Sequence, residues 1–281
     1  MLSVSALAGY LYCQRKIYLQ YVLRFFEPIK PATIKGTIRH QVHEAINNKE
    51  EEIVTSITKK LSKEELFNLY RNTHADILKE TITKYKDQLE KLNLSPEEIL
   101  KKVWPLIMEE SITRAKNIWE FMQTHLVYGK DLWEKLTPKI KTEYRITSEK
   151  LGIRGIIDQI EVYEKGVVPV ELKTGSCPKE GVWPNHKIQL AAYALLLEEG
   201  FSTNVKEGFI TYLDVKQRRH VPINPFLRQE LLDLITKVKN LLNNKDLPDF
   251  EKNQNKCNKC GIKDICHSPK TIEKRVKEIV E

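Results

Sequence analysis

Two carboxylates and a lysine form the group of residues in this sequence best suited to chemistry. Asp158 ends the run Gly-Ile-Ile-Asp, and Glu171 follows thirteen positions later in the run Glu-Leu-Lys that ends at Lys173. Residues two apart in a β-strand leave the same face of a sheet, so the side chains of Glu171 and Lys173 point the same way. A tight turn between neighbouring strands would bring Asp158 beside them.

Such a group could hold a divalent metal ion. Two carboxylates that converge at a sheet end repel each other unless one is protonated or a cation bridges them. Hard oxygen ligands suit Mg²⁺ or Mn²⁺, and a bound ion lowers the pKa of its water and stabilises charge on a phosphate. Lys173 could hold the attacking water or neutralise the charge that develops on the phosphate. The alternative is a surface hairpin with an ordinary lysine–glutamate pair.

Polar side chains on both sides of this group strengthen the metal-site interpretation. His40 lies four residues after Gly36, near the start of an expected helix, and His43 is an alternative close to the same helix face. Gln189 and Tyr193 are four residues apart, so they share one face of a helix. Each of these residues alone carries little information, but their order around the carboxylates is informative.

The five cysteines indicate a second site. An odd number of cysteines, without a secretion signal, argues against a disulfide framework. Cys257, Cys260 and Cys266 fall within ten residues, and Cys13 lies 244 positions before the first of them. Four thiolates suit either a [4Fe–4S] cluster or a tetrahedral Zn²⁺, and the C-terminal trio alone leaves both open. We interpret Cys177 as a cysteine that binds neither.

Hydrophobic patterning predicts the elements that position these residues. Helical stretches are expected over residues 5–23 and from residue 36 onward, followed by a polar helical block over 49–138 in which Ser62 and Ser95 begin capping boxes. Apolar residues that alternate with Lys141, Glu143 and Arg145 indicate a strand over 140–146. Further strands are expected over 153–163, 167–173, 209–213 and 215–223, with helices over 186–199 and 226–244. This order predicts a mixed central sheet flanked by helices.

Composition narrows the class of protein. The chain has 281 residues, 41% of them hydrophobic and 30% charged, which excludes a disordered or collagen-like chain. The sequence contains no apolar window of about 18 residues, so no membrane span is expected, and the absence of a signal peptide predicts a cytoplasmic protein. A net charge of +8 is compatible with a nucleic-acid partner. The candidate phosphate contacts are Arg15, Lys16, Lys187, Lys216, Arg218 and Arg219.

The order of a His motif, an aspartate, Glu-x-Lys and Gln-x-x-x-Tyr resembles that of the PD-(D/E)XK nucleases of the RecB type. One early cysteine and three late ones resemble the iron–sulfur members, and the short chain without a P-loop is most similar to the Cas4 family. The resemblance covers residues 1–45 and 139–270. The helical block over 49–138 is a departure, which points to the longer Csa1-like branch or to another RecB-like exonuclease.

The resemblance implies a role for each residue of the motifs. His40, Asp158, Glu171 and the carbonyl of Leu172 would bind Mn²⁺ or Mg²⁺, and Lys173 would be catalytic. Gln189 and Tyr193, with Arg15, would position DNA and the carboxylates. A [4Fe–4S] cluster would be held by Cys13, Cys257, Cys260 and Cys266. The expected α/β fold is restriction-endonuclease-like: one domain over 1–281, with an insertion over 49–138 and an iron–sulfur segment over 245–281 that Cys13 completes.

The implied activity is that of a metal-dependent DNA exonuclease. It would act on single-stranded ends or overhangs and trim spacer precursors in CRISPR adaptation, with Cas1 and Cas2 homologues as partners. A general repair exonuclease of the exonuclease V type is an alternative in the same enzyme class. A DNA-binding adaptor that does not cleave is an alternative in another class, although the complete set of Asp158, Glu171 and Lys173 argues against it.

Overall fold

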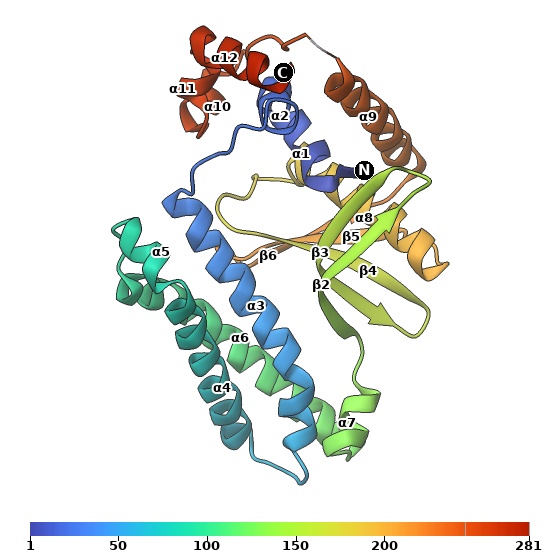
Figure 1. The fold of residues 1–281 in the computed structure, drawn as a ribbon. Coiled ribbons are helices and arrows are strands. Elements are labelled where there is room, and N and C mark those ends of the chain that lie inside the picture. Colours follow the sequence, from blue (N-terminus) through green and yellow to red (C-terminus); the bar gives the residue numbers. More distant parts are fainter. Residues whose placement is uncertain (245, 281) are drawn as a thin grey trace.

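A mixed six-stranded sheet forms the centre of the computed structural model, which describes residues 1–244 and 246–280 (Figure 1). Along the sheet the order is β1-β3-β4-β5-β6, and β2 pairs with the remaining edge of β3. The strands are β1 (Leu2–Ser3), β2 (Lys139–Ser148), β3 (Ile153–Tyr163), β4 (Gly166–Lys173), β5 (Glu207–Tyr212) and β6 (Gln217–Pro222). The predicted α/β fold with a mixed central sheet is therefore confirmed.

Strands β3 and β4 form the antiparallel hairpin that carries the predicted carboxylates. Their register pairs Gln159 with Val170, which places Asp158 directly opposite Glu171. Strand β4 then connects to β5, its parallel neighbour, through α8 (Pro184–Phe201). Nine residues in the middle of α8 are buried, because the helix packs on the sheet and also contacts α1 (Val4–Tyr12) and α9 (Pro225–Asn243).

The stretch predicted to be helical over residues 5–23 is helical for nearly all of its length, but it holds two helices rather than one. Helix α1 ends at Tyr12 and α2 (Gln14–Tyr21) begins after Cys13, whose backbone is extended at φ −164°. The Cys13 sulfur accepts a hydrogen bond from the backbone N–H of Lys16 at 3.3 Å and so caps α2. The apolar periodicity continues across Cys13, which hid the break.

Helix α3 (Pro31–Ser56) belongs both to the region around the sheet and to the helical block. It starts five residues before Gly36 and runs without interruption through residue 49, the expected start of the insertion. Beside it lie α4 (Lys63–Lys84), α5 (Lys86–Lys91), α6 (Pro96–His125) and α7 (Gly129–Lys135), and β2 begins at Lys139, directly after the predicted end at residue 138. The Ser62 capping box forms in full, whereas Ser95 accepts from the Glu98 N–H but bonds the side chain of Glu97.

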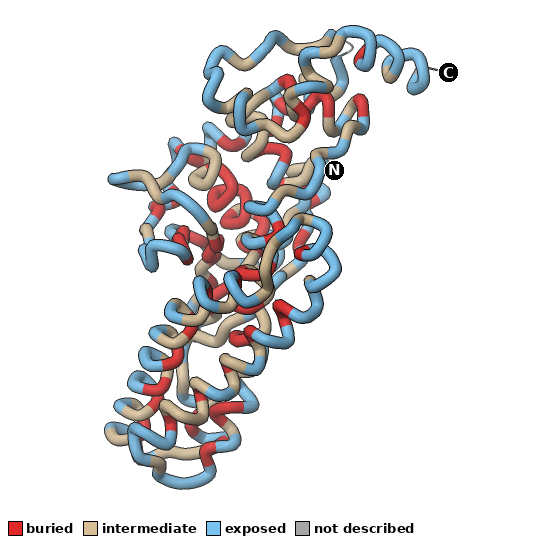
Figure 2. The backbone as a smooth tube through the Cα atoms, turned by 90° about the vertical axis from the view of Figure 1, so that its left-hand side faces the viewer, coloured by how far each residue is buried: buried red, intermediate tan, exposed pale blue. Residues whose placement is uncertain are grey.

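Buried residues run through the sheet region and through the helical block, so the elongated molecule has separate apolar cores (Figure 2). The sheet packs against α8 and α9, while α3, α4 and α6 bury Ile38, Leu78 and Ile107 among themselves. In the part of the chain described, no helix is long and apolar enough to cross a membrane.

The C-terminal segment lies beside the N-terminal helices (Figure 1). It contains α10 (Gln254–Lys259), α11 (Lys263–Cys266) and α12 (Pro269–Val280), whereas residues 245 and 281, the bounds of the predicted iron–sulfur segment, lie outside the described residues. Tyr12 donates its hydroxyl to the Lys256 carbonyl at 3.2 Å, and the Lys256 ammonium donates to the Tyr12 carbonyl at 2.8 Å. Apolar residues of α2 and of this segment, including Leu19 and Ile262, form a shared cluster. The two ends of the chain are therefore fastened together.

Candidate active site and cysteine cluster

Asp158 and Glu171 lie side by side at the end of the paired part of the β3–β4 hairpin. The Asp158 carboxylate accepts the backbone N–H of Leu172 at 2.7 Å through one oxygen. Glu171 is 3% exposed; its Oε1 accepts from Lys173 and from Gln189, each at 2.6 Å. Its second oxygen, Oε2, is buried and has no hydrogen-bond partner among the described residues. Buried polar atoms are normally paired, so this oxygen is available to bind a proton donor or a cation.

Lys173, Gln189 and Tyr193 continue the network from β4 into α8. The Lys173 ammonium donates to the Gln189 carbonyl oxygen at 2.9 Å as well as to Glu171, and the Gln189 amide donates to the Tyr193 hydroxyl at 2.9 Å. One turn of α8 separates Gln189 from Tyr193, as the sequence predicted. Gly155 makes room for this arrangement, since a Cβ there would lie 2.8 Å from the Tyr193 ring. The glycine of the Gly-Ile-Ile-Asp run is therefore needed to leave space for the Tyr193 ring.

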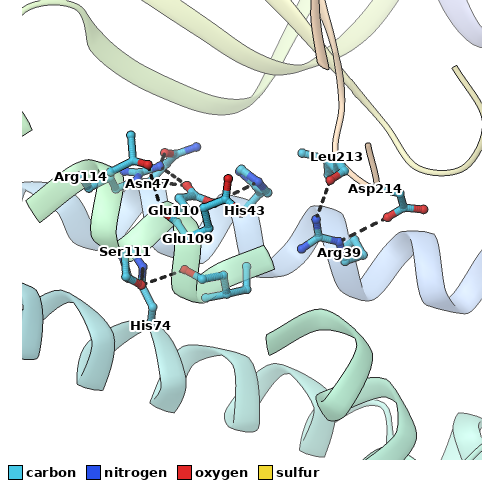
Figure 3. Close-up of polar contacts among 12 residues, drawn as sticks. Arg39, His43, Asn47, His74, Glu109, Glu110, Ser111, Arg114, Leu213 and Asp214 are labelled. Carbon is cyan, nitrogen blue, oxygen red and sulfur yellow. Dashed lines mark hydrogen bonds and ion pairs between the residues drawn. The ribbon is translucent and has the colours of Figure 1, made fainter. Parts of the chain in front are cut away.

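Helix α3 brings His40 to the carboxylates and takes His43 elsewhere. The His40 Nδ1 lies 3.5 Å from the Asp158 carboxylate. His43, the alternative, is half-buried against α6, where its Nε2 lies 3.3 Å from Glu110 (Figure 3). Close packing of α3 on the end of β4 sets this geometry, because a Cβ at Gly36 would lie 3.0 Å from the Thr174 hydroxyl.

Glu143 is a further candidate ligand that the sequence reasoning missed. It lies on β2 between Thr142 and Tyr144, which pair with Gln159 and Ile157, so Glu143 stands opposite Asp158. His40, Glu143 and Asp158 each offer one potential ligand atom, and these three atoms all lie within 4.8 Å of one another. In an alternating strand a glutamate is indistinguishable from a solvated charge, and its positive φ of 47° has no signature in the local sequence.

The charges of this site call for a cation. Burial and the neighbouring Asp158 raise the pKa of Glu171, and the same two causes raise the pKa of Glu143. Burial acts to lower the pKa of His40, but the hydrogen bond and the charge of Asp158 outweigh it and raise that pKa. Carboxylates, an imidazole and the unpartnered Glu171 Oε2 form a donor set that fits a divalent metal ion.

The four predicted cluster cysteines line one pocket. Cys13 faces Cys257, Cys260 and Cys266 across a hollow that is also lined by Tyr12, Arg15, Phe250 and His267. All five cysteines of the chain carry free thiols, and burial raises the pKa of Cys13 and of Cys266. Cys177 lies apart from this pocket, with its thiol 3.4 Å from the Gln217 side chain. The structure thus brings together the two ends of the chain that the sequence reasoning grouped.

Most of the expected phosphate contacts have partners within the protein. Arg15 is 8% exposed, donates to the carbonyls of Pro248 and Cys266, and stacks on Phe250, so its position favours a structural role over DNA contact.

The other expected phosphate contacts are mostly paired as well. Lys16 pairs with Glu27, Lys216 with Glu109, and Arg218 with Glu161. Arg219 bonds Gln217 and the Lys179 carbonyl, whereas among the described residues Lys187 forms no ion pair. The sequence could not reveal these long-range partners.

The raised pKa of Glu171 predicts how the metal-free protein responds to pH. A carboxyl whose folded pKa lies above its ordinary value of 4.5 stabilises the fold below that value, and this contribution is lost as the pH rises toward the folded pKa. We therefore expect Glu171→Gln to unfold at a higher temperature than the wild type at pH 8, by a few degrees, and at a similar temperature at pH 4.

Thermal denaturation in a chelator, followed by circular dichroism at both pH values, measures this difference. Adding Mn²⁺ at pH 8 should reverse the order, because only the wild type retains the full ligand set and gains stability from binding. Equal melting temperatures at pH 8 in the chelator would show that Glu171 is already compensated within the protein.

Comparison with known proteins agrees with this geometry. Residues 1–267 match the PD-(D/E)XK nuclease superfamily. The "CRISPR-associated exonuclease Cas4/endonuclease Cas1 fusion" of Leptospira interrogans is 32% identical over 49% of this chain and 27% of its own length. The "CRISPR-associated exonuclease Cas4" of Francisella tularensis subsp. novicida is 30% identical over 43% of this chain and 60% of its own length. These relatives confirm the resemblance to Cas4 that the motifs indicated.

A third relative matches more of the chain. The "DNA replication ATP-dependent helicase/nuclease DNA2" of Mus musculus is 26% identical over 83% of this chain and 22% of its own length. The chain thus spans 22–60% of the length of these three relatives. Because the superfamily match extends over residues 1–267, the chain belongs to the PD-(D/E)XK nuclease superfamily.

Proposed function

We propose that this protein is a metal-dependent DNA exonuclease that hydrolyses phosphodiester bonds at single-stranded ends or overhangs. The observation that carries the proposal is the meeting of Asp158, Glu171 and Lys173 in one site, in which Glu171 keeps a buried oxygen that no described residue bonds. His40, Asp158, Glu171 and the Leu172 carbonyl would hold Mn²⁺ or Mg²⁺, and the position of Glu143 adds it to this set. A bound ion would supply stabilisation of negative charge and an acidified water.

The protein's own side chains would then position the reacting groups. Lys173 is held by Glu171 and Gln189, so its ammonium is pre-oriented to hold a water or to stabilise charge on the phosphate. The Gln189 side chain accepts a hydrogen bond from Lys173 and donates one to Glu171, which holds these two residues together. The Gln189 amide is held in turn by its hydrogen bond to the Tyr193 hydroxyl. These two α8 residues act as positioning residues in this proposal, because their contacts are with the carboxylate and the ammonium.

A [4Fe–4S] cluster held by Cys13, Cys257, Cys260 and Cys266 is the second part of the proposal. All four cysteines line one pocket. Zinc ribbons usually use two close cysteine pairs, whereas here one cysteine lies near the N-terminus and three are clustered near the C-terminus. This arrangement supports an iron–sulfur cluster over zinc. The cluster would brace α1 and α2 against the C-terminal segment.

A role in CRISPR adaptation is the pathway we propose, with Cas1 and Cas2 homologues as partners and the cytoplasm as location. The relatives named as Cas4/Cas1 fusions support a physical association with Cas1. The match to the DNA2 helicase/nuclease covers more of this chain and supports, as the second candidate, a general DNA-repair exonuclease of the exonuclease V type. Co-purification with a Cas1 homologue from the native host would favour the first candidate.

Alanine variants of the catalytic group test the activity. We expect Asp158→Ala, Glu171→Ala and Lys173→Ala each to lower the cleavage rate of labelled single-stranded DNA with Mn²⁺ by about 100-fold or more, because each removes a metal ligand or the positioned ammonium. Asp76→Ala and Lys79→Ala, at exposed positions of α4, serve as charge-matched controls and should cleave normally.

Closed circular single-stranded DNA should resist the wild type, since it offers no end. Normal cleavage by all three active-site variants would refute the proposal. Tight binding of DNA by the wild type without any cleavage would support the adaptor alternative instead.

Purification under anaerobic conditions tests the cluster. We expect a brown protein that contains four iron and four sulfide per chain. Serine in place of Cys13, Cys257, Cys260 or Cys266 should remove the colour and lower the melting temperature, whereas Cys177→Ser should keep both. A colourless protein with one bound zinc would overturn this part of the proposal.

A further inference from the structure

Arg39 is a buried guanidinium whose hydrogen-bonding capacity is largely unused. It lies on α3 directly before His40 and is 5% exposed. One nitrogen donates to the Leu213 carbonyl at a long 3.4 Å, and Nε lies 3.8 Å from the Asp214 carboxylate, beyond hydrogen-bond distance (Figure 3). Nε and one terminal nitrogen have no hydrogen-bond partner among the described residues. An arginine cannot lose its proton, so this charge lacks the acceptors that a buried guanidinium requires.

Two hollows meet at Arg39. The first, of about 340 Å³, lies between α3, α6 and the turn after β4. The second, of about 370 Å³, lies between α3, α6 and the strands β5 and β6, and it is also lined by Glu110. Glu110 is already bonded to Arg114 at 2.7 Å and close to His43 at 3.3 Å, so its charge is compensated without Arg39.

The first hollow adjoins the candidate active site. Ala32, Gly36 and Thr174 line both this hollow and the one that contains His40 and Glu143. Thr174 directly follows Lys173, and Arg39 directly precedes His40. A strand of nucleic acid with one phosphate at the carboxylates would therefore present a neighbouring phosphate near Arg39.

The charges of the first hollow suit an anion. Lys35 and Lys102 line it together with Arg39; both are exposed and, within the described part of the chain, neither forms an ion pair. Asp214 and Glu98, which also line the hollow, partly oppose these three cations, and the other carboxylate oxygen of Asp214 accepts the Gly175 N–H at 2.8 Å. Apolar side chains of α6, among them Ile99 and Val103, line the opposite wall.

We infer that this hollow is a phosphodiester subsite for the single-stranded DNA substrate, one step away from the bond that is cut. Arg39 donates hydrogen bonds from its unpartnered nitrogens to the phosphate oxygens, and Lys35 and Lys102 add charge at the mouth. The inference rests on the proposed nuclease function. It gives the helical block a task, since α6 forms one wall of the subsite.

Binding measurements on a cleavage-deficient background test the subsite. In Lys173→Ala protein with Mn²⁺, fluorescence anisotropy with labelled oligo(dT) gives Kd over a series of salt concentrations. We expect Arg39→Gln to raise Kd about tenfold and to reduce the slope of log Kd against log salt by about 0.7, the value for one lost contact to a single strand. Arg71→Gln, on α4, removes an equal charge from a guanidinium that bonds neighbouring Asn72 and lies over the Phe67 ring, and it should change neither.

Two further measurements separate a binding role from a structural one. Arg39→Gln should melt at the same or a higher temperature, because it removes a buried charge whose ion pair with Asp214 is long and two of whose nitrogens have no hydrogen-bond partner among the described residues. Asp214→Asn keeps an acceptor for Gly175 but removes the competing charge, so it should tighten DNA binding severalfold, and only when Arg39 is present.

The outcomes distinguish this inference from the proposed function. If the background protein binds DNA and neither Arg39→Gln nor Asp214→Asn changes Kd, the subsite is wrong and the nuclease proposal stands. If Arg39→Gln lowers the melting temperature and Asp214→Asn leaves binding unchanged, Arg39 is a structural link between α3 and the sheet. If the wild type neither binds nor cleaves DNA, the nuclease proposal fails and the subsite fails with it.

Discussion

The structure depends on holding two like charges close together at the end of one hairpin. The register of β3 and β4 sets Asp158 opposite Glu171, and a slip of one residue would send Glu171 to the other face of the sheet. Lys173 compensates one oxygen of Glu171, and the other is buried and has no donor in the described part of the chain. The fold therefore stabilises an arrangement that is unfavourable by itself, and a divalent cation would make it favourable.

The rest of the chain supports this arrangement through packing. Helix α8 is fixed by the buried residues around it, and Gly155 leaves space for the Tyr193 ring, so Gln189 can reach both Glu171 and Lys173. Helix α3 carries His40 between Ile38 and Val42, which belong to the core of the helical block, and this ties the site to the insertion. The C-terminal segment clamps α1 and α2, and α1 packs against α8.

How much of this could be predicted depends on whether the determinants are local. Strand β3 was predicted with its observed bounds over 153–163, because its apolar pattern and its turns are encoded in neighbouring residues. The break at Cys13 was not, since it serves contacts with residues more than 240 positions away. Arg15 was expected at DNA and instead bonds two distant carbonyls. The same holds for Glu143 and Arg39, because the significance of each arises from its position relative to other elements.

The most direct test of the central claim is a crystal of the wild type soaked in Mn²⁺ and measured at an X-ray energy at which manganese scatters anomalously. We expect a peak in contact with Asp158 and with the Glu171 oxygen that has no partner among the described residues, with the His40 imidazole beside it. Well-ordered density for these three side chains with no manganese peak between them would contradict the account.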